Sequence, residues 1–199
     1  MVTAAPSKPS TATSELSARS RVIFPNAEDS DIYEAARAHP AIFLDVFGSI
    51  FDAPTNRSMR FQLWDWQWQM LSYLLQHKRV IILKARQLGM SWLAAGYALW
   101  VALNKPNSVI LLVSRTEGVA STLLSKCSYI LARLPAELRP AVIPRKDKDN
   151  TTEIYFSAIN SKILAVASTK ESGRSESATL VIADEWADHP FAEEMFTGY

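Results

Sequence analysis

Short apolar runs alternate with helical patterns along most of the chain, and this alternation constrains the fold more than any other feature. Three runs are typical of strands buried on both faces of a sheet: RVIILKA (79–85), PNSVILLVSR (106–115) and TLVIADEWA (179–187). Residues 91–105 and 117–134, which lie between these runs, have the length and apolar spacing of helices. The alternation predicts an α/β domain with a mainly parallel sheet flanked by helices.

The rest of the chain adds further helices and a strand pair. The apolar spacing over residues 27–51 predicts one or two amphipathic helices interrupted near Pro40, and residues 61–78 predict a helix rich in aromatic side chains. Residues 152–157 and 161–168 are expected to form two paired strands. Two polar stretches are expected to be loops: APTNRS (53–58) and PAELRPAVIPRKDKDN (135–150).

Composition limits the classes of protein that the chain can represent. Of the 199 residues, 48% are hydrophobic and 21% are charged, which suits a globular domain at residues 27–199 behind a flexible tail at residues 1–26. A formal net charge of +1 provides no bulk attraction to nucleic acid, so any such contact must come from a local patch. No apolar run reaches the ~18 residues that a membrane helix needs. The single cysteine, Cys127, excludes an internal disulfide, fits a reducing compartment and is expected to be a small buried residue.

The segment LKARQLGMSWL, residues 83–93, nearly matches a nucleotide-binding loop. In the pattern G-x-x-x-x-G-K-[ST], backbone N–H groups surround the phosphates, the Lys reaches them and the Ser or Thr holds Mg²⁺. With Gly89 and Ser91 aligned to this pattern, Met90 occupies the Lys position and Lys84 the first Gly position. Because such a loop curls around the phosphates, the long side chain of Lys84 can bring its ammonium to the same oxygens.

The loop also has a second cation and a helix N-terminus. Arg86 lies within it, and the helix that follows adds N–H donors and partial positive charge. An ordinary turn with solvated Lys84 and Arg86 is the alternative interpretation. The residues expected to bind the nucleotide in the loop are Lys84, Ala85, Arg86, Gln87, Leu88, Gly89, Met90 and Ser91.

Two adjacent carboxylates end the last apolar run. In TLVIADEWA, Asp184 and Glu185 directly follow apolar residues, which is the pattern of a Walker B strand. Asp184 is expected to hold Mg²⁺ together with Ser91, and Glu185 is expected to orient and activate the attacking water. The alternative is that both acids cap the following helix. Because both motifs follow an apolar run and occur in the required order, together they predict a site for ATP and Mg²⁺.

Gln67, in the segment WDWQWQML, is a candidate contact for the base of the nucleotide. A Gln amide donates and accepts at once, as the adenine edge requires, and Trp66 or Trp68 would flank the base. The alternative is that Trp64, Trp66 and Trp68 pack in the core and that Gln67 is polar surface.

Several segments taken together resemble a known family. WQWQML, VIILKARQLGMSWLAAGYALW, VILLVSRTEGVASTLLSK and SGRSESATLVIADEWA are similar to parts of the ATPase domain of the large terminase subunit of tailed bacteriophages. The resemblance implies a P-loop fold of the ASCE type and a motor that hydrolyses ATP to move double-stranded DNA into the capsid. It also implies a portal protein and a small terminase subunit as partners, a homo-oligomeric ring, and the cytoplasm of the bacterial host without membrane attachment.

The same resemblance implies roles for three basic residues. A Lys displaced to the first loop position is a variant of that family, which supports Lys84 as the phosphate cation. Arg86 matches a loop Arg that is discussed as an arginine finger acting in cis. Arg174, in SGRSESA, is the candidate for a finger presented to a neighbouring subunit.

The sequence departs from the family pattern after the Walker B run. The chain ends at Tyr199, without the family's coupling motif and nuclease domain, so we expect a fragment or a truncated product and assign no nuclease activity. Two alternatives stay open. One is a superfamily-2-type helicase or translocase, although helicases keep Lys at the seventh loop position; the other is a non-catalytic prophage remnant that binds nucleotide or DNA.

The remaining polar residues suggest no second site. His39, His77 and His189 have no ligand spacing, and with one cysteine in the chain a zinc site is not expected. RKDKDN is expected to be a solvated turn, with phosphate contacts from its basic residues as the alternative.

Overall fold

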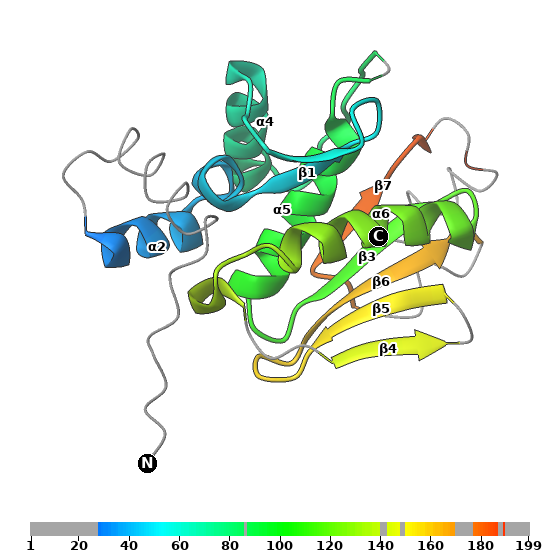
Figure 1. The fold of residues 1–199 in the computed structure, drawn as a ribbon. Coiled ribbons are helices and arrows are strands. Elements are labelled where there is room, and N and C mark those ends of the chain that lie inside the picture. The colour runs from blue at the N-terminus through cyan, green and yellow to red at the C-terminus, as the bar shows by residue number, and fades with distance from the viewer. Residues whose placement is uncertain are drawn as a thin grey trace.

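The computed structural model describes residues 28–85, 87–139, 143–147, 150–169, 177–186 and 189. The expected tail at residues 1–26 lies outside these ranges. Five strands form one sheet in the order β4-β5-β6-β3-β7 (Figure 1). These strands are β3 (Val109–Ser114), β4 (Ile143–Asp147), β5 (Asn150–Phe156), β6 (Ser161–Ala167) and β7 (Leu180–Ala183).

The sheet is mixed, which corrects the expectation of a mainly parallel one. Strands β6, β3 and β7 run parallel to one another. Strand β5 pairs antiparallel with both β4 and β6. The strand pair expected at residues 152–157 and 161–168 is confirmed as β5 and β6, and as a hairpin it necessarily adds antiparallel strands to the parallel core.

Helices α5 and α6 pack against one face of the sheet, as Figure 1 shows. They confirm the two helices expected after the first and second apolar runs. The N-terminal segment also confirms its expected helices, broken at His39 just before Pro40. The helices are α2 (Asp29–Ala38), α3 (Pro40–Ile42), a π-helix (Phe43–Phe47), α4 (Asp65–Gln76), α5 (Met90–Asn104), α6 (Glu117–Leu131) and a 3-10 turn (Ala136–Leu138).

Alternate side chains of β3 divide the apolar interior into two clusters. Ile110 and Leu112 are fully buried in the main core, together with side chains of α5 and α6. Leu111 and Val113 belong to a smaller cluster on the opposite face, where Val181 of β7 packs against them. This alternation is the period-two pattern of a strand buried on both faces, which the run PNSVILLVSR predicted.

The segment of residues 79–85 differs from its expected structure. The run RVIILKA was expected to be a buried parallel strand, but it is irregular, with Ile81 88% and Leu83 101% exposed. An apolar run becomes a buried strand only where a neighbouring strand pairs with it. Residues 79–85 pair with none of the described strands, and the outer edge of β7, which pairs with β3 alone, is left unpaired by this segment.

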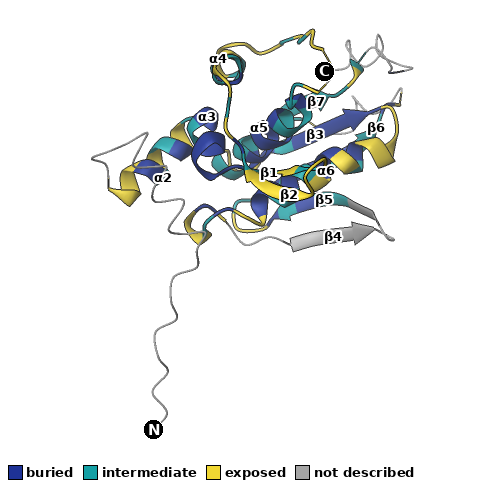
Figure 2. Cartoon of the chain, turned by 45° about the horizontal axis from the view of Figure 1, so that its top comes forward, coloured by how far each residue is buried: buried dark blue, intermediate teal, exposed yellow. Residues whose placement is uncertain are grey.

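Three short strands depart from the expected structure: β1 covers the end of the segment that was expected to be helical, and β2 and β4 overlap the expected loops. Strands β1 (Ser49–Asp52) and β2 (Arg57–Arg60) form an antiparallel hairpin on either side of a turn at residues 53–56. Strand β4 lies within the charged segment 135–150 and contains part of the expected solvated turn. Figure 2 shows β2 as mostly exposed, and β1 is mostly of intermediate burial, so neither strand has the buried apolar face that would mark it in the sequence. Among the helices of the described ranges, none combines the length and apolarity needed to cross a bilayer.

Candidate nucleotide site

The carboxyl ends of β3 and β7 lie side by side. Their parallel register pairs Val113 with Ala183, so the next residues, Ser114 and Asp184, follow at the same edge of the sheet. The amide of Asp184 also donates to the carbonyl oxygen of Val113 at 3.1 Å, which extends the pairing one residue beyond β7. Ligands of open α/β sheets bind at this edge, where the carboxyl ends of parallel strands meet.

The two predicted metal ligands are in direct contact. The hydroxyl Oγ of Ser91, in the first turn of α5, donates to Asp184 Oδ2 at 3.0 Å across 93 positions of sequence. The other carboxylate oxygen, Oδ1, accepts from the amide of Glu185 at 3.1 Å. The fold therefore brings the Ser of the loop and the Asp of the last apolar run to one point, as the two-motif prediction requires.

The loop of residues 84–91, hereafter the 84–91 loop, leads into α5 through two left-handed residues. Gln87 has φ 62° and Gly89 has φ 69°, and Gly89 is the N-cap of α5. No side chain caps this helix end, so its first N–H groups and partial positive charge are available to an anion. Lys84 and Ala85 are exposed, whereas Arg86 lies outside the described residues.

Met90 and Leu88 have mainly packing roles in the 84–91 loop. Met90 is only 8% exposed and belongs to the main core, while Leu88 packs against that core from a half-buried position. Position seven of the motif, where a nucleotide-binding loop usually has Lys, therefore carries a core side chain here. This burial is consistent with a phosphate cation supplied from another position of the loop.

Gln67 is buried and already bonded within the protein. It is 2% exposed; its Oε1 accepts from the amide of Trp64 at 3.0 Å and its Nε2 donates to the carbonyl oxygen of Leu88 at 3.4 Å. Trp66 and Trp68 are partly buried against the main core, whereas Trp64 is 54% exposed. The amide of Gln67 thus connects α4 to the 84–91 loop, a structural task that the adenine hypothesis did not anticipate.

Glu185 is exposed and has an unusual backbone conformation. Its φ of 54° lies in the left-handed region, which non-glycine residues rarely adopt. Such residues cluster at functional sites, where the surrounding structure maintains them despite the strain. Glu185 is placed directly beyond Asp184, with its side chain open to solvent; Arg174, the other predicted catalytic residue, lies outside the described residues.

Two further residues bear on Asp184: His189, for which the sequence analysis assigned no role, and Lys126, which it did not consider. The ring nitrogen Nε2 of His189 lies 2.8 Å from the carbonyl oxygen of Asp184, and the ring of His189 lies 5.2 Å from that of Trp186 at a tilt of 34°. Lys126 of α6 is half-buried; burial lowers the pKa of its ammonium, and the charge of Asp184 raises it in part. Neither residue belongs to a motif, and only the packing of α6 over the sheet brings Lys126 toward this edge.

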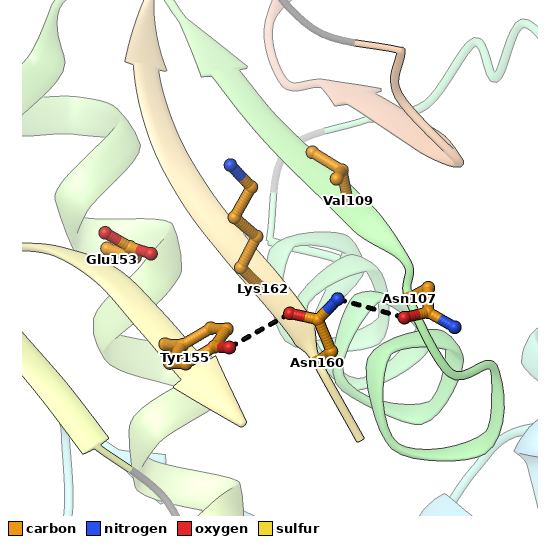
Figure 3. A pocket seen from close by; sticks show the side chains of 6 residues that line it. All are labelled: Asn107, Val109, Glu153, Tyr155, Asn160 and Lys162. Atoms are coloured by element: carbon orange, nitrogen blue, oxygen red, sulfur yellow. Dashed lines mark hydrogen bonds between the residues drawn. The ribbon is translucent and has the colours of Figure 1, made fainter. Parts of the chain in front are cut away.

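A cavity of about 380 Å³ lies at the opposite end of the sheet, near the start of β3 and β6. Figure 3 shows its polar lining, in which the hydroxyl of Tyr155 donates to Asn160 and the amide of Asn160 donates to Asn107, both at 2.9 Å. These bonds hold the β5–β6 turn against the loop that precedes β3. The cavity is therefore remote from Ser91 and Asp184, and the residue types that line it suggest no catalytic arrangement.

The cysteine and a histidine have structural roles. Cys127 is fully buried, its thiol donates to the carbonyl oxygen of Ala95 at 3.3 Å, and burial raises the pKa of this thiol to about 12. It is thus the small buried residue expected. His39 accepts through Nδ1 from the amide of Ala41, and burial lowers the pKa of its imidazole. The described residues contain no cluster of three or more potential His, Cys, Asp or Glu metal ligands.

The oxygens of the site fit Mg²⁺ in kind and number. Mg²⁺ prefers oxygen ligands and is usually bound through one or two carboxylates, waters and substrate phosphates, not by a closed protein cage. The Ser91 hydroxyl and the Asp184 carboxylate are such ligands, and the α5 N-terminus beside them suits a phosphate. Ser91 and Asp184 would therefore hold the metal, and the 84–91 loop would hold the phosphates.

No family model and no curated protein matches the chain. Among solved structures, a similar fold occurs in the crystal structure of the HK97 bacteriophage large terminase, with a TM-score of 0.62 and 17% sequence identity. The match covers 81% of this chain and 34% of that one, so the chain spans about a third of the length of that protein. At this identity the similarity establishes a shared α/β fold with a mixed sheet flanked by helices.

Proposed function

We propose that the chain is a terminase-like ATPase domain that binds ATP with Mg²⁺ at the 84–91 loop and hydrolyses it. The hydrogen bond between Ser91 and Asp184 carries this proposal, because it joins the loop motif and the carboxylate motif at 3.0 Å. The fold similarity to a phage large terminase supports the same kind of protein. We extend the proposal to translocation of double-stranded DNA, driven by ATP hydrolysis.

Each residue of the site has a distinct task in the proposed reaction. The free N–H groups at the start of α5 and the ammonium of Lys84 bind the phosphate oxygens, and Ser91 and Asp184 hold the metal. Mg²⁺, when bound, supplies positive charge that neutralises the transferred phosphoryl group. The exposed carboxylate of Glu185 orients the attacking water and accepts its proton.

The partners and remaining catalytic groups follow from the resemblance. Arg86 and Arg174 are proposed as arginine fingers, the first in cis and the second toward a neighbouring subunit of a ring. A portal protein and a small terminase subunit are the proposed protein partners, and the host cytoplasm is the proposed location. These assignments depend on the nucleotide site, so that site is the part to test first.

Isothermal titration with a non-hydrolysable ATP analogue tests the site directly. We expect binding that depends on Mg²⁺ and that Ser91→Ala weakens, because this substitution removes a proposed metal ligand and the hydrogen bond to Asp184. Ser125→Ala is a matched control, since Ser125 is an exposed serine of α6 whose hydroxyl donates to the carbonyl oxygen of Ser121. Equal affinity with and without Mg²⁺ would contradict the roles of Ser91 and Asp184.

A further inference from the structure

The segment of residues 79–85, which leads from α4 into the 84–91 loop, keeps apolar side chains in water. Ile81 is 88% exposed and Leu83 is 101% exposed, so both side chains point into solvent. Ile82, between them, is half-buried and packs against the main core. This alternation is the period-two pattern of a strand that has one supported face and one free face. Any surface that covers the free face would therefore stabilise the segment.

The outer edge of β7 is such a surface. Strand β7 pairs with β3 along one side, and no described strand pairs with its other side. The four residues of β7 are all apolar, yet each is only half-buried. An edge strand of this kind presents backbone N–H and C=O groups to which a further strand can add. A strand added here would bury residues 79–85 in the way that their sequence pattern predicts.

The side chains of the segment alternate in step with those of β7. Ile182 packs against the main core, whereas Val181 packs against the smaller cluster on the opposite face. Ile82 already packs against the main core, so a strand that places Ile82 beside Ile182 would turn Ile81 toward Val181. A shift of register by one residue would send every side chain to the wrong face. The two alternations therefore favour Ile82 beside Ile182.

The same register carries Lys84 to the candidate nucleotide site. Lys84 lies two residues after Ile82, and Asp184 lies two residues after Ile182, so the two would follow neighbouring strands at one edge of the sheet. The added strand would run parallel to β7, because the loop after it returns to Asp184 through the 3.0 Å contact of Ser91. Residues two apart in a strand share a face, which turns Lys84 toward the start of α5.

We propose that residues 80–83 are a detachable strand, which adds in parallel to the outer edge of β7 and thereby brings Lys84 beside Asp184. This inference rests on the proposed function for the role of Lys84, and it specifies how that site is completed. Phosphate groups at the N-terminus of α5 attract the ammonium of Lys84 and so favour the added strand over the exposed segment. ATP binding and strand addition then strengthen each other, because each favours the state that the other requires.

Disulfide trapping tests the added strand directly. The full chain carries Ile81→Cys with Val181→Cys, two positions that lie level in the proposed register. Neighbouring strands are about 5 Å apart, which a disulfide can bridge. The native Cys127 does not interfere, because it is fully buried and burial raises the pKa of its thiol to about 12. With oxidised glutathione we expect an intramolecular bridge in the ligand-free protein, and a rate at least about fivefold higher with Mg²⁺ and a non-hydrolysable ATP analogue.

Leu75→Cys with Val181→Cys is the matched control for the trapping. Leu75 is an apolar residue of α4 that is 43% exposed, and this pair should form no intramolecular bridge. Equal bridging of the two pairs, or no bridge between positions 81 and 181 with or without the analogue, would overturn the proposal. A bridging rate that bound analogue does not change would overturn the coupling to nucleotide. Bridging in a protein that binds no analogue would refute the proposed function and retain the strand.

Leu83→Asn tests the same coupling without a crosslink. Because Leu83 is fully exposed in the detached segment, this substitution should leave the Tm of the ligand-free protein within about 1 °C of the wild type. It should weaken binding of the analogue roughly fivefold, since the side chain is buried only in the added strand. Leu75→Asn is the control and should change neither quantity. Unchanged affinity in Leu83→Asn would overturn the coupling, and a ligand-free Tm clearly below that of Leu75→Asn would overturn the detachment.

Discussion

The side chain of Gln67 joins the start of α4 to the 84–91 loop, because its Nε2 donates to the carbonyl oxygen of Leu88 at 3.4 Å. The same amide accepts from Trp64 at 3.0 Å through Oε1, and the side chain is 2% exposed. A buried amide bonded at both ends fixes the distance between the two segments it connects. The conformation of the 84–91 loop thus depends on a side chain of α4 that lies 21 positions before Leu88 in the chain.

Gln67→Glu should loosen this connection. A carboxylate cannot donate to Leu88, and it becomes a buried charge, so we expect the free energy of unfolding to fall by about 1–3 kcal/mol. Nucleotide affinity should fall with it. Gln69→Glu, at an exposed position of the same helix, should change stability by less than about 0.5 kcal/mol. Urea denaturation measures both; an unchanged stability with an altered preference between ATP and GTP would instead support base recognition by Gln67.

The glycine of the 84–91 loop should be irreplaceable for backbone reasons. Gly89 has φ 69°, and a Cβ there would lie 3.4 Å from Nε2 of Gln67. Gly89→Ala should destabilise the protein by roughly 1–2 kcal/mol, the cost of a left-handed backbone for an L-residue. Gly118→Ala in α6 meets no atom within 4 Å and should stabilise the helix by up to about 1 kcal/mol. Denaturation curves that move in the same direction for both variants would contradict the conformational argument.

The sequence predicted the helices and strands whose own apolar spacing shows which side chains are buried. Strand β3 alternates between two apolar clusters, and α5 and α6 follow their expected spans closely. Residues 79–85 show the limit of this reasoning, since the same apolar composition occurs in a segment that leaves Leu83 fully exposed. Strand burial depends on a neighbouring strand, which a single run of residues does not reveal.

The candidate site was predictable where both partners belonged to motifs. Ser91 and Asp184 were identified separately, and the fold brings them into contact. Gln67 was identified but given another task, because its bond to Leu88 requires knowing how α4 crosses the loop. Lys126 was missed because a half-buried lysine within an amphipathic helix has no sequence signature. Sequence patterns do not reveal which side chains of two different helices or loops come into contact, and both roles depend on such contacts.

Substitutions of Glu185 should affect turnover and the free energy of unfolding independently. Glu185→Gln keeps the shape and the left-handed φ of 54°, so ATP affinity and stability should remain while turnover falls by about 10²–10⁴-fold through loss of the general base. Glu185→Gly should also be inactive but should raise the free energy of unfolding by roughly 1 kcal/mol, because glycine adopts positive φ without strain. Phosphate release and chemical denaturation measure the two effects. Wild-type turnover in the Gln variant would rule out Glu185 as the base.

Lys84 is the residue on which phosphate binding should depend most. Its ammonium is exposed at the entry to the 84–91 loop, and a charge-assisted contact of about 1.5–3 kcal/mol corresponds to a roughly tenfold to hundredfold change in affinity. Lys84→Ala should therefore abolish most binding of the ATP analogue. Lys78→Ala removes another exposed lysine just beyond α4 and should leave binding unchanged. Equal effects of the two substitutions would make Lys84 an ordinary surface charge.

Substitutions of Met90 test whether the ammonium that binds the phosphates could also come from position seven of the motif. Because Met90 is 8% exposed and packs in the main core, Met90→Ala should lower the free energy of unfolding by about 2 kcal/mol or more while the folded protein still binds nucleotide. Met90→Lys would place an ammonium in that core unless the first turn of α5 rotates. The double variant Lys84→Ala with Met90→Lys should thus recover binding only in part, and with lower stability. Full recovery, measured by titration with the ATP analogue, would show that position seven reaches the phosphates and that the buried state of Met90 is not required.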